Sequence, residues 1–171
     1  MSAAKEPEEA RKGNPMARDL RMSRMLHVLI HMDRHVGRAT SEQIAQMIST
    51  NAVVVRRMMA GLRERGIVSS EKGHGGGWQL ACPLAEISLR DVYEAVGHPP
   101  LFNIGPQADP SPCLVEQAVD ARLDATLAEA ETRLLAQFAA ITVEEVAQDF
   151  ERRFEESGHT VPFPWHGATG E

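Results

Sequence analysis

Basic side chains in the stretch 51–80 are the residues of this sequence with the best-defined chemistry. Arg56 and Arg57 lie near the start of a predicted helix, and Lys72 and His74 stand in the glycine-rich segment that follows it. A guanidinium group can bond two acceptors of guanine in the major groove, whereas other basic contacts neutralise phosphates. The types and spacing of these residues therefore predict a surface that binds double-stranded DNA.

The glycine-rich segment also permits a second chemistry, because residues 74–77 spell the HGGG sequence of an esterase oxyanion hole. That chemistry requires a nucleophile elbow, G-x-S-x-G, and the chain contains no such sequence. It also requires alternating strands and helices, a pattern that this sequence does not have. We therefore expect that the protein is not an enzyme.

Three histidines, His27, His31 and His35, follow one another at four-residue steps in the first predicted helix. Imidazoles with this spacing can share a zinc ion or another transition metal. Such a site normally needs a thiolate or carboxylate from elsewhere, and none is indicated. The histidines are weak metal candidates, and the alternative is that they face solvent or line an interface.

The sequence predicts a helix-turn-helix that would expose these basic residues. Asn51 is a good N-cap for the second helix of such a motif, and Gly66 ends that helix. Thr40 and Gln43 form a capping box that opens the helix before it. The apolar positions predicted to be buried in the second helix are Val55, Met58, Met59 and Leu62. Residues 20–36 form the first helix of the chain, with a buried face at Met22, Met25, Leu26, Leu29, Met32 and Val36.

Two short β-prone runs, residues 67–71 and 78–81, are joined by the glycine-rich segment and predict a hairpin. A hairpin after a helix-turn-helix is a wing, which reaches the DNA backbone or minor groove while the helix enters the major groove. The predicted fold class is mainly α with a small β-hairpin wing: a winged helix-turn-helix domain plus a long dimerisation helix.

The longest predicted helix, residues 113–140, has an apolar stripe over some seven turns. At about 1.5 Å per residue this helix is near 40 Å long, longer than a small winged domain. We expect the stripe to pack on a second copy, giving a homodimer; packing on its own domain is the alternative. The predicted division is a disordered tail (1–15), the winged domain (16–97), a loop (98–112), dimerisation helices (113–156) and a C-terminal tail (157–171).

Charge is segregated along the chain, although the whole carries a net charge of -6. Residues 16–80 contain ten Lys/Arg and five Asp/Glu, a net charge of +5. Residues 81–171 contain five Arg and sixteen Asp/Glu, a net charge of -11. Because salt screens charges beyond about 8 Å, the basic half can bind DNA despite the acidic half. The alternative is a winged module that binds protein through the acidic half.

No run of eighteen apolar residues occurs, so we expect no membrane span. The first residues have no apolar core of a signal peptide, which predicts a cytoplasmic location. Two cysteines, Cys82 and Cys113, are too few for a disulfide framework.

The run LRERGIVSSEKGHGGGWQLA at residues 62–81, followed by ISLRDVYEAV at 87–96, carries a resemblance to a known family. It is similar to the signature LR..GLV.S..G..GGY.LA of the Rrf-two (Rrf2) family of bacterial regulators, which includes IscR, NsrR and CymR. The likeness covers about residues 16–146. It implies a homodimeric transcriptional regulator, expected to be a repressor, on a palindromic operator, with the long helix making the dimer.

By position, the resemblance also implies which residues meet DNA. Base-facing positions of the recognition helix correspond to Asn51, Ala52, Val53 and Arg56. The wing tip corresponds to Lys72, Gly73, His74 and Gly75. Phosphate contacts are expected from Arg18, Arg21 and Arg57.

Some members of the family hold an iron–sulfur cluster on three cysteines. Only the last of these cysteines has a counterpart in this sequence, which is Cys113. No cysteine occurs in residues 83–112, and a [2Fe–2S] centre normally needs four ligands. We therefore expect no cofactor, with an iron–sulfur-dependent regulator as the alternative. Cys113 has two interpretations: a redox-sensing thiolate at a helix start, or a small residue that packs that start.

Overall fold

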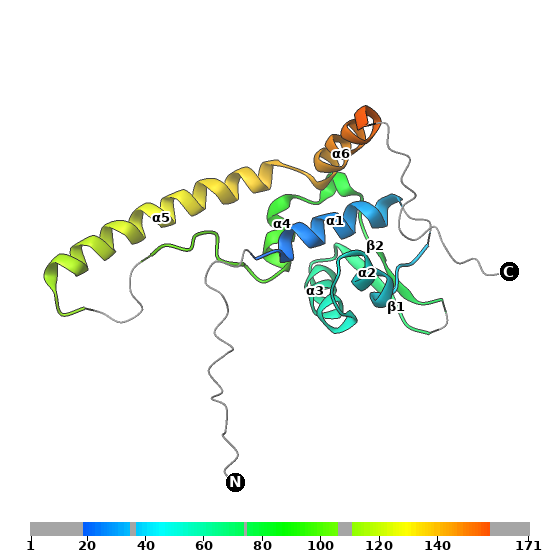
Figure 1. The fold of residues 1–171 in the computed structure, drawn as a ribbon, viewed down its shortest axis with the longest axis horizontal. Helices are drawn as coiled ribbons and strands as arrows, with labels where there is room; N and C mark the ends of the chain where they lie inside the picture. The colour runs from blue at the N-terminus through cyan, green and yellow to red at the C-terminus, as the bar shows by residue number, and fades with distance from the viewer. Residues whose placement is uncertain (1–18, 35–36, 74, 106–110, 158–171) are drawn as a thin grey trace, which may run out of the picture.

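The protein is mainly helical with one two-stranded antiparallel hairpin, as predicted (Figure 1). The computed structural model describes residues 19–34, 37–73, 75–105 and 111–157. The elements are α1 (Arg21–Arg34), α2 (Ser41–Met47), α3 (Ala52–Glu64), β1 (Val68–Glu71), β2 (Gly77–Leu80), the 3₁₀ turn η1 (Leu84–Glu86), α4 (Leu89–Ala95), α5 (Leu114–Ala140) and α6 (Val143–Ser157). The predicted N-terminal tail and residues 158–171 lie outside the described residues, as do residues 106–110 of the predicted loop.

Hydroxyl side chains begin three helices through capping boxes, including the one predicted at Thr40 and Gln43. The Thr40 hydroxyl accepts from the Gln43 amide at 3.2 Å, and the Gln43 side chain accepts from the Thr40 amide at 2.7 Å. Ser88 begins α4 and Thr142 begins α6 with the same reciprocal bonds. These bonds satisfy amides that a helix start leaves without partners, so sequence alone locates these starts.

The core lies between α1, α3, α4 and the segment that leads into α4. The predicted stripe of α3 is confirmed, because Val55, Met58, Met59 and Leu62 are all buried. Other large side chains with almost no exposed surface are Met25, Leu29, Ile44, Leu84, Ile87 and Val92. One face of α3 packs on this core, so the opposite face of the helix is exposed to solvent.

The last helix, α6, which the predicted division grouped with α5 as dimerisation helices, packs on this core. Val143 and Ala147 have no exposed surface and pack in the same cluster as the residues of α1 and α3. Arg34 of α1 bonds Glu151 of α6 at 2.5 Å. The amphipathic pattern of α6 showed that it has an apolar face, but not which surface covers that face.

The histidines of α1 line the interface with α6. The rings of His27 and His31 lie with centroids 4.5 Å apart, beside Val146 and Phe150 of α6. Burial lowers the pKa of His27, and burial together with the nearby His27 lowers the pKa of His31 to about 4. Among the described residues no group of three or more possible ligands is placed to hold a metal. His35 lies outside the described residues.

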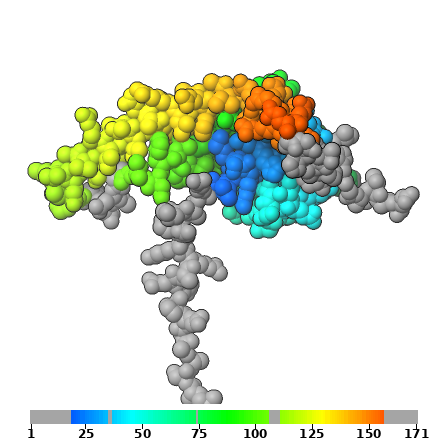
Figure 2. All heavy atoms as spheres, turned by 45° about the horizontal axis from the view of Figure 1, so that its top comes forward, coloured from blue at the N-terminus to red at the C-terminus, as the bar shows by residue number. Residues whose placement is uncertain are grey.

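The long helix α5 packs on α4 along its C-terminal part (Figures 1 and 2). There the ring of Phe138 meets Tyr93 of α4 edge to face, with centroids 6.3 Å apart. The apolar stripe of α5, which was predicted to pack on a second copy, thus packs partly on its own chain. At the other end α5 extends away from the body, and its apolar side chains are open to solvent. No helix of the described residues is both long and apolar enough to cross a bilayer.

Candidate DNA-binding surface

The N-terminal turn of α3 presents one side to solvent. The Asn51 side chain accepts a hydrogen bond from the Val54 amide at 2.9 Å, which caps the helix as predicted. Val53, Arg56 and Arg57 are exposed, and Ala52 is half-buried. The residues predicted to face bases therefore lie on the side of α3 that the core leaves free.

Arg56 is held by an acid that the sequence reasoning did not single out. Its Nη2 bonds Oε1 of Glu42, on α2, at 2.7 Å, and both side chains are more than half exposed. An exposed pair of this kind contributes at most about 1 kcal/mol, so a nucleic acid can replace Glu42 as partner. The pair orients the guanidinium without making it unavailable.

The hairpin of β1 and β2 is formed as predicted, with Val68 opposite Leu80 and Glu71 opposite Gly77. Lys72 and Gly73 are exposed at its tip, and Gly73 and Gly75 have φ values of +100° and +78°. These values lie in the region that L side chains rarely adopt, which explains the glycines. His74, between them, lies outside the described residues.

A buried tryptophan attaches the wing to the helix-turn-helix. The indole Nε1 of Trp78 donates to Oγ of Ser41, the first residue of α2, at 3.0 Å. The backbone of Trp78 also exchanges two hydrogen bonds with Ala39, each 2.9 Å long. Arg38 adds an ion pair with Glu71. Ala39, just before α2, thus forms an isolated antiparallel bridge with Trp78 of β2, a contact that sequence reasoning missed because a single bridge leaves no alternating pattern.

These contacts place α3 and the wing on one side of the molecule. Residues 38–42 bond Glu71 at the wing and Arg56 on α3. In Figure 1 α3 and the hairpin lie together at the bottom of the molecule, whereas α6 lies at the top and α5 extends to the left. α3 and the wing therefore lie together, on the side of the body opposite α6.

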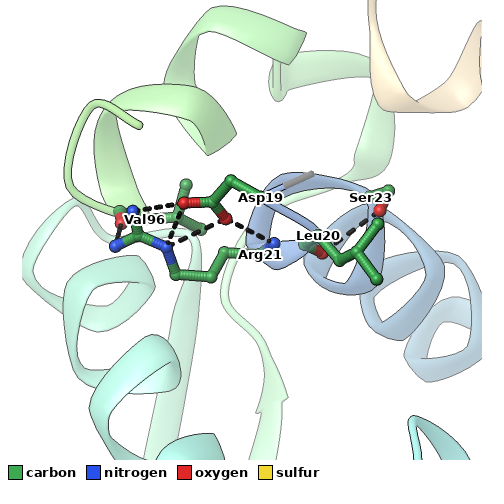
Figure 3. Close-up of polar contacts among 5 residues, drawn as sticks. All are labelled: Asp19, Leu20, Arg21, Ser23 and Val96. Atoms are coloured by element: carbon green, nitrogen blue, oxygen red, sulfur yellow. Dashed lines mark hydrogen bonds and ion pairs between the residues drawn. The ribbon is translucent and has the colours of Figure 1, made fainter. Parts of the chain in front are cut away.

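Arg21, predicted to contact phosphate, is engaged within the fold (Figure 3). Its Nη2 and Nε bond Oδ2 of Asp19 at 2.6 and 2.9 Å, and its Nη1 donates to the carbonyl of Val96 at 2.9 Å. The hydrogen bond from Arg21 is the largest cause that lowers the pKa of Asp19. Arg21 joins the start of α1 to the end of α4. Arg18, also predicted to contact phosphate, lies outside the described residues.

Comparison with known proteins decides the family. The sequence profile of the Rrf2 family, described as "Iron-dependent Transcriptional regulator", matches residues 19–149. The chain belongs to the Rrf2 family. Like other Rrf2 members it is a transcriptional regulator that binds DNA and is not an enzyme. The resemblance inferred from the wing signature is confirmed.

The similarity between this Rrf2 regulator and known relatives extends over most of each chain. "Putative HTH-type transcriptional regulator YwnA" of Bacillus subtilis (strain 168) is 33% identical over 129 residues, which are 74% of this chain and 93% of YwnA. A crystal structure from Lactobacillus plantarum aligns with a TM-score of 0.64 and 24% identity, covering 82% of this chain and 99% of that one. IscR of T. potens aligns with a TM-score of 0.54 and 16% identity, covering 88% and 97%. These two structures support the winged-helix fold.

The family description names iron, but the donors of this Rrf2 regulator do not fit an iron–sulfur cluster. Its two cysteines, Cys82 and Cys113, lie in different surroundings. Cys82 packs against the core, and burial raises the pKa of its thiol. Cys113 is exposed at the start of α5. With no cysteine in residues 83–112, the chain cannot supply the thiolates that a [2Fe–2S] centre needs.

Cys113 differs from Cys82 in its exposure and in the direction in which the pKa of its thiol is shifted. It is the N-cap residue of α5, and the backbone amides of Glu116 and Val115 lower the pKa of its thiol. A lowered thiol pKa and an exposed position both favour reaction with oxidants, because the thiolate is the nucleophile. The thiol lies directly beside the exposed apolar residues that begin α5.

Proposed function

We propose that this Rrf2 regulator is a homodimeric repressor that binds a palindromic operator. The start of α3 enters the major groove with Asn51, Ala52, Val53 and Arg56 toward the bases. Arg57, Lys72 and the residues around the wing tip contact the backbone, together with His74 and Arg18, which lie outside the described residues. Arg21 contacts a phosphate in this proposal only by exchanging its partner Asp19, as Arg56 exchanges Glu42.

The observation that carries the proposal is the exposure of α3 and the wing on one side, linked through residues 38–42. A helix and a hairpin arranged in this way can follow a groove and its adjacent backbone. Exposed Arg56 is free to exchange Glu42 for guanine, and Lys72 is free for a phosphate.

The homodimer is proposed on the exposed part of α5. Leu114, Val115 and Val119 are 78%, 72% and 51% exposed, and with Leu123 they line a shallow apolar groove. Contiguous apolar surface of this kind marks an interaction site. Two copies joined through it would present two α3 helices to half-sites about one DNA turn, roughly 34–36 Å, apart. Bound at a promoter, such a dimer would exclude RNA polymerase and so repress.

Selection of bound duplexes from a random pool tests the proposal and yields the operator. With that operator, Arg56→Ala is expected to cost about 1–3 kcal/mol and to relax preference at one base pair. Lys72→Ala is expected to weaken all duplexes alike and to reduce the salt slope of log K by about 1. Fluorescence anisotropy over a range of salt concentrations measures both effects.

The matched control is Arg152→Ala on α6, which removes an exposed arginine away from α3 and the wing and should leave binding unchanged. Arg56 and Lys72 variants that bind every duplex as the parent does would refute the assignment of helix and wing. Absence of any salt dependence would instead favour a protein-binding module.

Redox control is proposed at Cys113. Its thiolate attacks a peroxide, the O–O bond breaks, hydroxide leaves, and the sulfur is oxidised to a sulfenic acid. This places a larger polar group beside Leu114 and Val115, so we expect weaker dimerisation and weaker operator binding. Cys113→Ser should abolish the peroxide response, and Cys82→Ser should retain it, because Cys82 is half-buried with a raised thiol pKa. A response that survives in Cys113→Ser excludes this thiol as the sensor.

A further inference from the structure

Val53 is an apolar side chain that the fold leaves mostly exposed to solvent. It is 62% exposed, and of the described residues between Arg21 and Asn103 it is the one large hydrophobic side chain on the exposed surface. Its neighbour Val55 is completely buried. A β-branched residue is also a poorer helix former than alanine, so neither packing nor helix formation accounts for valine here.

The position of Val53 relative to Arg56 suggests what it meets. The two residues are three apart on α3, so they lie on the same face of the helix. At about 1.5 Å per residue they are separated by roughly 4.5 Å along the axis, between one and two base-pair steps of about 3.4 Å. Glu42 holds the guanidinium of Arg56. The methyl groups of Val53 therefore remain open beside it.

One base offers an apolar partner in the major groove. Thymine carries a methyl group at C5, whereas cytosine and the purines present polar edges there. We propose that Val53 reads the C5-methyl of a thymine in each operator half-site, within one or two base pairs of the base that Arg56 contacts. This inference rests on the proposed function and adds to it a specificity-determining residue and the group that it recognises.

Replacing single thymines of the selected operator by deoxyuridine tests the inference at the level of one methyl group. Deoxyuridine keeps the O4 acceptor and the pairing with adenine. We expect one sensitive thymine position in each half-site. Loss of its methyl group in one half-site should weaken operator binding by the parent protein about fourfold, and loss in both half-sites about 16-fold. Substitutions elsewhere in the duplex report any effect of deoxyuridine on DNA shape.

Val53→Ala should bind the thymine and deoxyuridine operators equally, because it lacks the contacting methyl groups. Alanine at an exposed helical position keeps the fold, as it is the better helix former. Ile104→Ala is the matched control: it removes an apolar side chain that is 70% exposed outside the proposed surface, and should keep the full fourfold difference.

The outcomes distinguish a failure of this inference from a failure of the proposed function. A parent that binds its operator with no sensitivity to deoxyuridine at any half-site position overturns the role of Val53 and leaves the proposed function standing. A Val53→Ala variant that retains the fourfold loss does the same. A parent that selects no duplex overturns both.

Discussion

Replacing Val119 and Leu123 together by glutamate is expected to convert the protein to a monomer and to weaken binding to a palindromic operator at least 100-fold. Both side chains belong to the apolar groove of α5, and neither is buried within the chain. A carboxylate buried in an apolar interface costs several kcal/mol unless it is paired. A monomer also loses the linkage between half-sites, which alone is worth about 10²- to 10⁴-fold. Light scattering gives the mass, and operator titration gives the affinity.

The control for this double variant is Ala121→Glu with Ala125→Glu. It adds the same charge to the same helix at exposed positions that do not line the groove. The control should remain dimeric and bind as the parent does, and affinity for a single half-site should be the same in both variants. A Val119/Leu123 variant that stays dimeric would show that another surface joins the copies.

Gly61→Ala is expected to destabilise the protein by about 3 kcal/mol or more, although alanine normally stabilises a helix by about 1 kcal/mol relative to glycine. Gly61 lies in α3 where that helix crosses α4. A Cβ atom at Gly61 would lie 2.0 Å from the carbonyl oxygen of Ala95. Both atoms are fixed by backbone, so no rotamer change relieves the overlap and α3 must move from α4.

Thermal unfolding measures this effect, with an expected fall of at least about 6 °C in Tm. Gly105→Ala is the matched control, because nothing lies within 4 Å of the added Cβ there. At such a site alanine is expected to be neutral or to stabilise by about 0.4–1 kcal/mol through the unfolded chain. A Gly61→Ala protein as stable as the control would contradict the close crossing of α3 and α4.

A shift of α3 should also weaken DNA binding, because α4 packs against α3 and holds it in position. If Gly61→Ala folds at low temperature, its affinity for the operator should fall together with its stability. Arg56 would then meet the groove from a displaced helix, and a misplacement of 1 Å is enough to break a bidentate hydrogen bond.

Several features of the fold could be predicted from sequence because their causes are local. The capping boxes at Thr40, Ser88 and Thr142 need only residues within one helical turn. The buried stripe of α3 follows from a 3.6-residue repeat. The wing tip follows from glycines at positive φ, such as Gly73 and Gly75. The family followed from the same stretch, since the spacing of these residues is itself the signature.

Sequence alone was enough to predict the main helices, the hairpin, the family, and the exposed positions of Arg56 on α3 and Lys72 on the wing. Only the folded chain shows that Trp78 bonds Ser41, that Arg21 bonds Val96, and that α6 packs on α1. The first two pairs are 37 and 75 residues apart. Such contacts depend on how complete elements pack together, and a periodic pattern states only that an element has an apolar face. Its partner is chosen by the shape and volume of the whole core.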